Sequence, residues 1–386
     1  MKKVLVAVGV VGMLLMVFWL ARQEQQPYQV ETYQEQINEN LAFAKGLSLI
    51  TEPDGSQVVF WSELQNHKNS NPSAHLKTAT IAAEDLRMTA PSTVITTPFI
   101  QNPISASASA TKRIVTFGAM HEKAMQQFFI GPSTTVAALQ TVKGSGHSGR
   151  VASTKDSHII AWGEGAKNSG GLGQAERLHL SVYDDAGSLI DEALITTREE
   201  DQESWPQLAA SSTRALLIWQ RAIEEEDYVQ LMYALYDPKA QRFQKRPLVL
   251  QPNNAKEAYQ VNYVEPINAF VVTGNTRDNQ GYMYIINETG RVTHGSFNLP
   301  PFVQETTPAI KQGQGSAELT YPMAPSGFIT YEVTENQVAE KRQIFDEYVW
   351  EDLGTAGVYK ESGEIYFITL SEHGIVEKII HKRGES

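Results

Sequence analysis

The nine histidines are the residues of this sequence best suited to hold a metal ion or to carry a proton near neutral pH. No two of them have the HxH or HExxH spacing that places two ligands on one face of an element. His179 lies inside an apolar run, so we interpret it as a packed or edge histidine rather than a ligand. The chain has no cysteine, which excludes disulfides, thiolate metal sites and cysteine nucleophiles.

Acidic residues form the second candidate group for metal binding. Between Asp184 and Asp227 there are twelve Asp or Glu against three Arg and no Lys, a local charge of -9 within the overall -12. The dense runs at residues 199–201 and 224–227 are typical of solvated loops. The functional alternative is a divalent-cation site or a docking face for a basic partner, with Glu224, Glu225 and Asp227 as candidate ligands.

A second oxygen-rich segment spans residues 275–281 and contains Asp278 and Asn279. These two residues are also candidate metal ligands, although a polar hairpin turn explains the segment equally well. Neither this segment nor the acidic runs have the DxDxDG spacing of an EF-hand loop. The sequence therefore predicts no cofactor, and calcium is the ion that these oxygen ligands would hold.

The most glycine-rich segment, residues 163–173, lacks both GxxxxGK[ST] and GxGxxG. We interpret it as a flexible loop between two strands, with a lid over a binding site as the alternative. No GxSxG elbow is present either, and no pair of catalytic carboxylates can be named from one sequence. The catalytic residues, if the protein is an enzyme, stay unidentified at this level.

The elements that would position these residues are short β-strands. Seven nearly continuous apolar runs, rich in β-branched and aromatic residues, are typical of strands buried on both faces. They lie at residues 58–61, 114–117, 159–162, 216–219, 270–272, 328–331 and 365–368. Their last residues are 56, 45, 57, 53, 59 and 37 positions apart, about 51 on average.

A second predicted strand follows each of the seven runs. These strands lie at residues 76–81, 127–130, 178–183, 229–236, 282–286, 342–349 and 375–380. Turns ending in glycine, such as those closing at Gly187, Gly290 and Gly374, follow or join several of them. Repeats of this length with several short strands each indicate a β-propeller.

The chain resembles bacterial β-propellers with TolB-like or WD40-like repeats, through segments such as residues 51–60. No Trp-Asp dipeptide ends the repeats, so true WD40 repeats are disfavoured, and no sialidase-type Asp box is present. The resemblance implies an all-β fold with a single propeller over residues 43–386. This length predicts seven blades of about 49 residues, with six or eight as alternatives and a pair of β-sandwiches as the competing fold.

Ring closure makes a sharper prediction. Little chain remains after residue 380 to build the outermost strand of the last blade. Propellers often borrow that strand from the N-terminal end, which removes an exposed sheet edge. The candidates are residues 29–33 and residues 47–50.

The N-terminus predicts export. Lys2 and Lys3 precede an uncharged run over residues 4–21, long enough for most of a ~30 Å hydrocarbon core. Because Phe18, Trp19 and Leu20 are too bulky for a cleavage site, we favour a signal anchor over residues 1–21 to a cleaved signal peptide. The polar residues 22–42 then form a tether that could contain the ring-closing strand.

These observations predict a single-pass protein of the bacterial cell membrane, with its N-terminus inside and its propeller on the extracytoplasmic side. A cleaved signal would make it secreted. The net charge of -12 argues against nucleic acid as a partner. Because every motif search for catalysis fails, the leading hypothesis is a scaffold that binds a protein or glycan of the cell envelope. The alternative is an exported glycoside hydrolase or lyase with carboxylates lining the channel of the propeller.

Overall fold

The computed structural model describes residues 28–34, 41–43, 46–65, 73–82, 87–97, 101–121, 124–131, 133–138, 146–164, 177–195, 202–223, 226–244, 246–351, 353–360 and 362–383. The predicted membrane span lies outside these ranges, as do residues 165–176 of the glycine-rich region. Within the ranges, no helix is long and apolar enough to cross a membrane.

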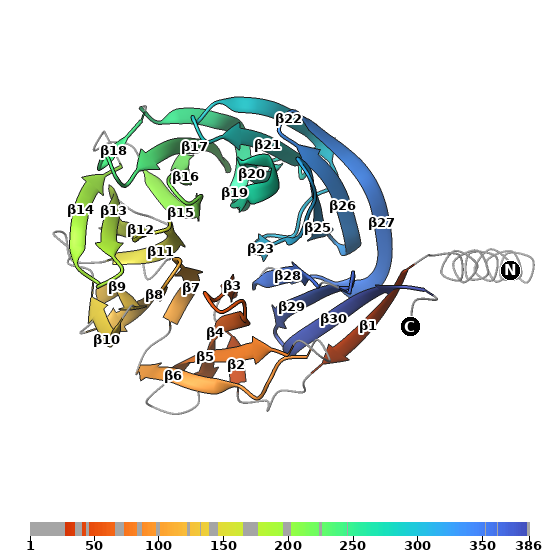
Figure 1. Ribbon diagram of the computed structural model, residues 1–386, viewed down its shortest axis with the longest axis horizontal. Helices are drawn as coiled ribbons and strands as arrows, with labels where there is room; N and C mark the ends of the chain where they lie inside the picture. The colour runs from red at the N-terminus through yellow and green to blue at the C-terminus, as the bar shows by residue number, and fades with distance from the viewer. Residues whose placement is uncertain are drawn as a thin grey trace, which may run out of the picture.

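The strands form sheets arranged in a ring around a central axis, as in a β-propeller (Figure 1). The all-β propeller prediction is thereby confirmed, and the alternative of paired sandwiches is excluded. The first three sheets contain β2 (Leu41–Phe43), β3 (Ser48–Thr51), β4 (Gln57–Gln65), β5 (Ala74–Ile81) and β6 (Ser92–Thr97), then β7 (Gln101–Ala108), β8 (Arg113–His121), β9 (Ala124–Gly131) and β10 (Ser133–Ala138), then β11 (Gly146–Ser153), β12 (Ser157–Glu164), β13 (Arg177–Asp184) and β14 (Leu189–Leu194).

An eight-stranded sheet follows, with a 3-10 turn, η1 (Glu265–Ile267), between two of its strands. Its members are β15 (Glu203–Ala210), β16 (Ala215–Ala222), β17 (Tyr228–Asp237), β18 (Arg242–Phe243), β19 (Leu248–Val264), β20 (Ala269–Thr276), β21 (Gly281–Asn287) and β22 (Val292–Leu299). The N-terminal part of β19 pairs with β17, and its C-terminal part pairs with β20. This long strand therefore ends one unit of the ring and begins the next.

Two sheets complete the ring. They contain β24 (Ala309–Gln312), β25 (Ala317–Pro322), β26 (Ser326–Thr334) and β27 (Gln337–Val349), then β23 (Thr306–Thr307), β28 (Thr355–Tyr359), β29 (Ile365–Ser371), β30 (Gly374–Lys382) and β1 (Tyr28–Gln34). The short β23 runs parallel to β28 and lies nearest the axis.

All seven predicted apolar runs lie in strands with a partner on each side, namely β4, β8, β12, β16, β20, β26 and β29. Every residue of β12 is buried. Alternate side chains of a strand point to opposite faces, and in β12 both faces meet a neighbouring sheet. Ile159 packs with Trp219 of β16, while Ile160 packs with Ile114 of β8. This double burial explains why the runs are continuously apolar rather than alternating.

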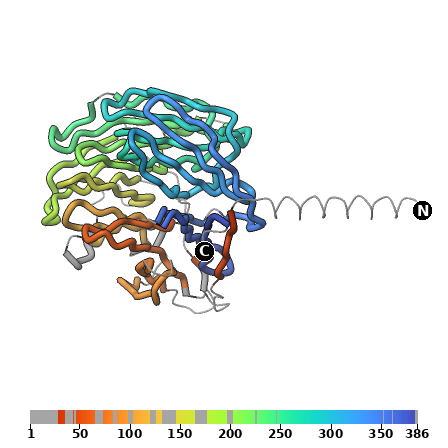
Figure 2. Tube along the Cα trace, turned by 45° about the vertical axis from the view of Figure 1, so that its right-hand side comes forward, coloured from red at the N-terminus to blue at the C-terminus, as the bar shows by residue number. Residues whose placement is uncertain are grey.

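The ring closes through its N-terminal strand. All seven residues of β1 pair antiparallel with β30, from Tyr28 opposite Lys382 to Gln34 opposite Val376. Figure 2 shows this red segment beside the blue C-terminal strands. The prediction for residues 29–33 is confirmed. The other candidate, residues 47–50, lies in β3, which pairs with β4 inside its own sheet, so that prediction is wrong.

Side chains fasten this seam to the preceding sheet. The Lys378 ammonium on β30 lies 3.0 Å from Thr32 Oγ1 of β1 and 2.6 Å from Asp346 Oδ2 of β27. Arg342 of β27 donates to the Tyr28 hydroxyl at 3.2 Å. Burial lowers the pKa of Lys378, and the Asp346 carboxylate opposes that shift. Because three strands from two sheets share these contacts, side-chain interactions hold β1 in place in addition to its backbone hydrogen bonds with β30.

Buried glutamines link one unit of the ring to the next elsewhere in the ring. The Gln127 Oε1 on β9 accepts the Gly149 amide of β11 at 2.9 Å, and Gln220 Oε1 on β16 accepts the Glu257 amide of β19 at 3.0 Å. Both amides lie where bulges interrupt the innermost ladder. The glutamines thus satisfy backbone donors that the bulges leave without a strand partner.

Removing residues 22–34 tests the closing strand. Without β1, the edge of β30 is exposed and Lys378 loses Thr32, so we expect Tm to fall by at least about 5 °C, at roughly 2 °C per kcal/mol for a large domain. A chain lacking only residues 22–27 is the matched control and should keep its Tm. Equal melting temperatures for the two deletions, measured by calorimetry, would show that β1 does not close the ring.

Candidate functional site

The innermost strands enclose a central cavity of about 140 Å³. Residues from five inner strands, β3, β7, β11, β15 and β19, line it together with residues 305–307 beside β28. Every blade of a propeller can contribute a side chain to the central channel, so this cavity is the first candidate for a functional site.

A buried ion pair crosses the cavity. One guanidinium nitrogen of Arg150, on β11, donates to both carboxylate oxygens of Glu305 at 2.6 and 2.8 Å. The other terminal nitrogen reaches the Ile104 carbonyl at 3.4 Å, and only 7% of either charged side chain is exposed. Among the residues that the structure describes, Glu305 is the one carboxylate in the lining of this cavity, and Arg150 neutralises it. The two charged side chains of the pair therefore hold each other within the channel lining.

Two amide groups supply hydrogen-bond donors to the same cavity. The Gln260 Oε1 accepts the backbone amide of Thr306 at 2.8 Å, which leaves Nε2 buried and without a protein partner. The Nδ2 of Asn262 is buried in the same way. A group rich in acceptor oxygens is the complement of these donors.

Two more carboxylates are buried on the β11–β14 sheet and the next one. Glu164, at the end of β12, accepts from or ion-pairs with His179 Nε2 at 2.8 Å, and the His179 ring stacks on Trp162 at 4.7 Å. Glu203, at the start of β15, binds Arg221 at 2.6 Å. His179 is thus a packed histidine with a carboxylate partner, as the sequence predicts. Each carboxylate has a cationic or imidazole neighbour of its own.

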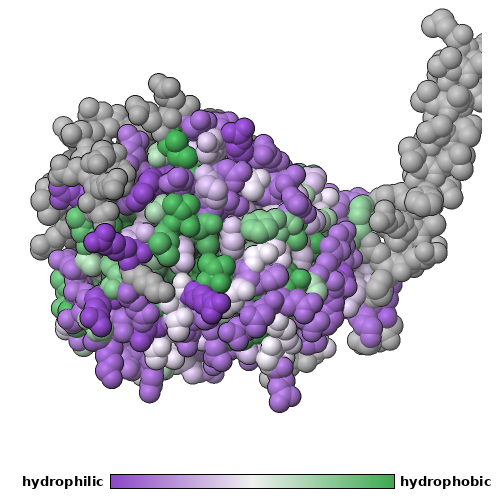
Figure 3. Space-filling view, turned by 90° about the horizontal axis from the view of Figure 1, so that it is seen from above, coloured by the Kyte–Doolittle hydropathy of each residue, from purple (hydrophilic) through white to green (hydrophobic). Residues whose placement is uncertain are grey.

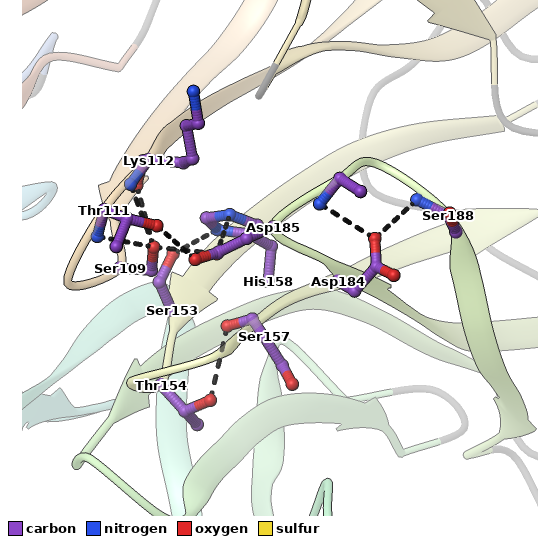
Figure 4. A network of polar contacts seen from close by, with 11 residues as sticks. Ser109, Thr111, Lys112, Ser153, Thr154, Ser157, His158, Asp184, Asp185 and Ser188 are labelled. Atoms are coloured by element: carbon purple, nitrogen blue, oxygen red, sulfur yellow. Dashed lines mark hydrogen bonds and ion pairs between the residues drawn. The ribbon is translucent and has the colours of Figure 1, made fainter.

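A Ser–His–Asp constellation occurs in the turns at one face of the ring (Figure 4). The Ser153 Oγ lies 2.8 Å from His158 Nδ1, directly across the β11–β12 ladder. On the other side of the fully buried imidazole, Nε2 lies 3.1 Å from Asp185 Oδ1. The distances alone match a nucleophile, a base and an orienting acid.

The hydrogen bonds around this constellation indicate that it connects neighbouring sheets. Asp185 also accepts hydrogen bonds from the hydroxyls of Ser109, at 2.8 Å, and Thr111, both in the turn of the β7–β10 sheet. The backbone continues the connection, since the Ala110 amide reaches Lys155 and the Lys155 amide reaches Ser212 of the following sheet. Asp185 thus joins two sheets instead of serving His158 alone.

Sequence reasoning missed this network, although a signal for it exists. Three such turns begin at Ser109, Thr154 and Ser211, and in each the backbone amide of that residue bonds to the carbonyl three positions on. Their separations, 45 and 57, equal those of the neighbouring apolar runs. Arg150 and Glu305 carry no comparable signal.

The predicted metal ligands occupy turns on the surface. Asp278 and Asn279 lie between β20 and β21, where Asp278 is 69% exposed and 3.7 Å from the Arg277 guanidinium. That guanidinium also lies over the ring of Tyr228. The residue that precedes Tyr228 in the sequence, Asp227, is exposed. Glu224 and Glu225 lie outside the described residues. Among the residues that the structure describes, no three His, Asp or Glu side chains are grouped to hold a metal ion. Calcium binding at these positions stays a prediction.

Comparisons with known proteins show a shared fold. The chain matches no protein-family model and no curated protein. A chain of a mitotic checkpoint complex has a TM-score of 0.52 at 11% identity, over 92% of this chain and 93% of its own. A protein of unknown function from Dyadobacter fermentans has a TM-score of 0.51 at 10% identity, over 92% of this chain and 100% of its own. These likenesses support a propeller-type fold, and the resemblance to TolB-like repeats stays a resemblance.

Substitutions in the channel ion pair test how much it contributes to the stability of the fold. Replacing Arg150→Met leaves the Glu305 carboxylate buried and unpaired, so we expect a loss of about 3–5 kcal/mol in the free energy of unfolding. The double variant Arg150→Met/Glu305→Gln should recover part of that loss, because no bare charge is left. Urea unfolding of the wild type, both single variants and the double variant measures the coupling, and simple additivity would contradict a direct pair.

His158 predicts a pH dependence of stability. Burial lowers its pKa below the ordinary value of 6.5, and the Asp185 carboxylate opposes that shift. Below about pH 6.5 the unfolded chain therefore binds a proton that the folded chain does not, and stability falls by up to about 1.4 kcal/mol per pH unit. We expect His158→Gln to flatten this decline between pH 7 and 5.5. Parallel wild-type and variant curves from urea unfolding at each pH would disprove the assignment.

Proposed function

We propose that this protein is a non-catalytic binding module, which presents a propeller to a protein or glycan partner in the bacterial envelope. The Arg150–Glu305 ion pair in the channel lining is the observation that carries the proposal. Glycoside hydrolysis needs two carboxyl groups flanking one bond, about 5–10 Å apart. Among the described residues, the lining of the central cavity offers one, Glu305, already held by Arg150 at 2.6 Å.

The outer strands of the sheets supply surface for partners. Large apolar side chains are exposed there, on β14, β19, β22 and β27. They are Leu189, Ile190, Leu194, Leu248, Val249, Phe297, Phe345 and Val349. Figure 3 shows apolar groups of this kind among polar ones on one side of the ring. Apolar groups at a rim support binding through the outer surface rather than through the axis.

We further propose that residues 4–21 anchor the chain in the cell membrane, with the propeller on the extracytoplasmic side. Only residues 22–27 separate this predicted span from β1, and six residues reach about 20 Å at most. The seam between β27 and β1 would therefore face the membrane. We also infer a seven-bladed ring, counted as five sheets plus the two halves that share β19.

The second candidate function is an exported glycoside hydrolase or lyase. The observation that favours it is the burial of Glu164 and Glu203 on adjacent sheets, with one Glu203 oxygen lacking a hydrogen-bond partner. Buried carboxylates are candidates for a general acid and a general base. Their separate partners, His179 and Arg221, place this candidate second.

Membranes from cells expressing the full chain and the variant Glu203→Gln distinguish the two functions. A binding module should stay in the membrane fraction after an alkaline wash, capture the same envelope partner in both forms, and leave a panel of envelope glycans uncleaved. The matched control is Glu192→Gln, a change at an exposed carboxylate on β14. Glycan cleavage that Glu203→Gln abolishes and Glu192→Gln retains would make the protein an enzyme. Loss of the chain from the membranes during the alkaline wash would contradict the proposed membrane anchor.

A further inference from the structure

The seam where the ring closes contains a larger cavity than the channel, about 510 Å³. It lies between the outermost strand of one sheet, β27, and the closing strand β1, which are neighbours in Figure 1. Lys378 of β30 and Arg383 beyond it complete the lining. This volume is within the range of about 300–1,000 Å³ typical of small-molecule sites.

A bulge in β27 builds one wall of this seam cavity. In the β26–β27 ladder, Phe328 pairs with Ile344 and Ser326 pairs with Val349, so that Gly327 alone faces the four residues 345–348. These four residues all line the cavity. Bulges redirect side chains out of a regular ladder, and this one brings Asp346 to Lys378.

The far wall and the buried part of the cavity are polar. Lys378 is 1% exposed and contacts Asp346 and Thr32, while its ammonium also lies 4.5 Å from the centre of the Tyr348 ring. Burying an ammonium is costly unless its partners are close, so this arrangement is held in place by its contacts. Thr32 and Gln29 of β1 add a hydroxyl and an amide to the lining.

The charges of the described residues in the lining cancel. Lys378 and Arg383 carry positive charge, and Asp346 and Glu347 carry an equal negative charge. A charged ligand would meet a like charge as well as an opposite one, and it would disturb the Lys378–Asp346 contact. A neutral ligand with hydroxyl or amide groups avoids both costs and can bond to all of these side chains.

Aromatic rings supply the apolar part of the cavity. Tyr28, Phe345 and Tyr348 all line it. The Tyr28 ring has the Arg342 guanidinium 5.0 Å from its centre, which fixes its position. Phe345 is 41% exposed on the bulge. Flat rings beside hydroxyl and amide groups complement a ligand with both apolar faces and a polar rim.

We propose that the seam cavity binds a neutral oligosaccharide of about two or three rings, whose apolar face packs on Phe345 and Tyr28. Its hydroxyls bond to Gln29, Thr32 and Asp346. This inference rests on the proposed binding function and names its ligand class and its site. The ligand spans β1 and β27, so bound sugar also holds the closing strand against the preceding sheet.

Ligand titrations of the full chain test the proposal, in a detergent without a sugar headgroup. The probes are the neutral trimers triacetylchitotriose, cellotriose and maltotriose, together with the cationic glucosamine trimer and the anionic galacturonate trimer. We expect at least one neutral trisaccharide to bind and both charged trimers to bind at least tenfold more weakly. Phe345→Ala should weaken that binding at least tenfold.

The matched control is Val94→Ala, because Val94 is an exposed apolar residue, at 38%, on the outer strand β6 and does not line the seam cavity. It should leave sugar affinity unchanged, and thermal melting should show both variants folded. Sugar binding that survives Phe345→Ala, equal binding of charged trimers, or no binding of any neutral trimer would overturn the inference. Partner capture that persists without sugar binding leaves the proposed function standing, whereas loss of both ends both proposals.

Discussion

The antiparallel pairing of β1 with β30 is the constraint on which the rest of the ring depends. Each sheet buries both faces of its central strands against two neighbours, as Ile159 and Ile160 of β12 illustrate. An open ring would leave two sheets with one uncovered face each. Closure by a strand from the other end of the chain removes that cost, since the last sheet gains an outer strand and the first and last sheets are held together.

Polar side chains fix how the sheets fit, while apolar burial supplies the driving force. The Arg150–Glu305 pair, the Lys378–Asp346 pair and the Asp185 network each join different sheets. Buried ion pairs contribute little net stability compared with apolar substitutes, but removing one partner is expensive. Such contacts penalise any other register of the ring. These contacts also bear on the function we propose. The charged and polar groups that could carry out catalysis are already paired with one another between sheets, so the surface available to a partner lies at the rim and at the seam.

The candidate site was predictable only where the repeat itself carries information. Seven apolar runs and seven following strands could be located, because burial on both faces leaves a local pattern in consecutive residues. The turns at Ser109, Thr154 and Ser211 obey the same spacing and could have been found from it. The oxygen-rich composition of their segment made Asp278 and Asn279 candidate metal ligands. In the structure they lie in an exposed turn, and Arg277 supplies the nearby positive charge. Composition cannot distinguish a ligand set from a solvated hairpin.

The sequence by itself determined the seven apolar runs, the strand that follows each of them and the double burial of the central strands. These follow from interactions between residues that are close along the chain. It left two candidates for the closing strand, residues 29–33 and 47–50, and only the tertiary structure decided between them. The tertiary structure also decided what lines the channel and the seam. Arg150 and Glu305 are 155 positions apart, and Lys378 and Thr32 are 346 apart. Contacts over such separations depend on how the whole ring closes, and no local pattern of hydrophobicity or turn residues records that geometry.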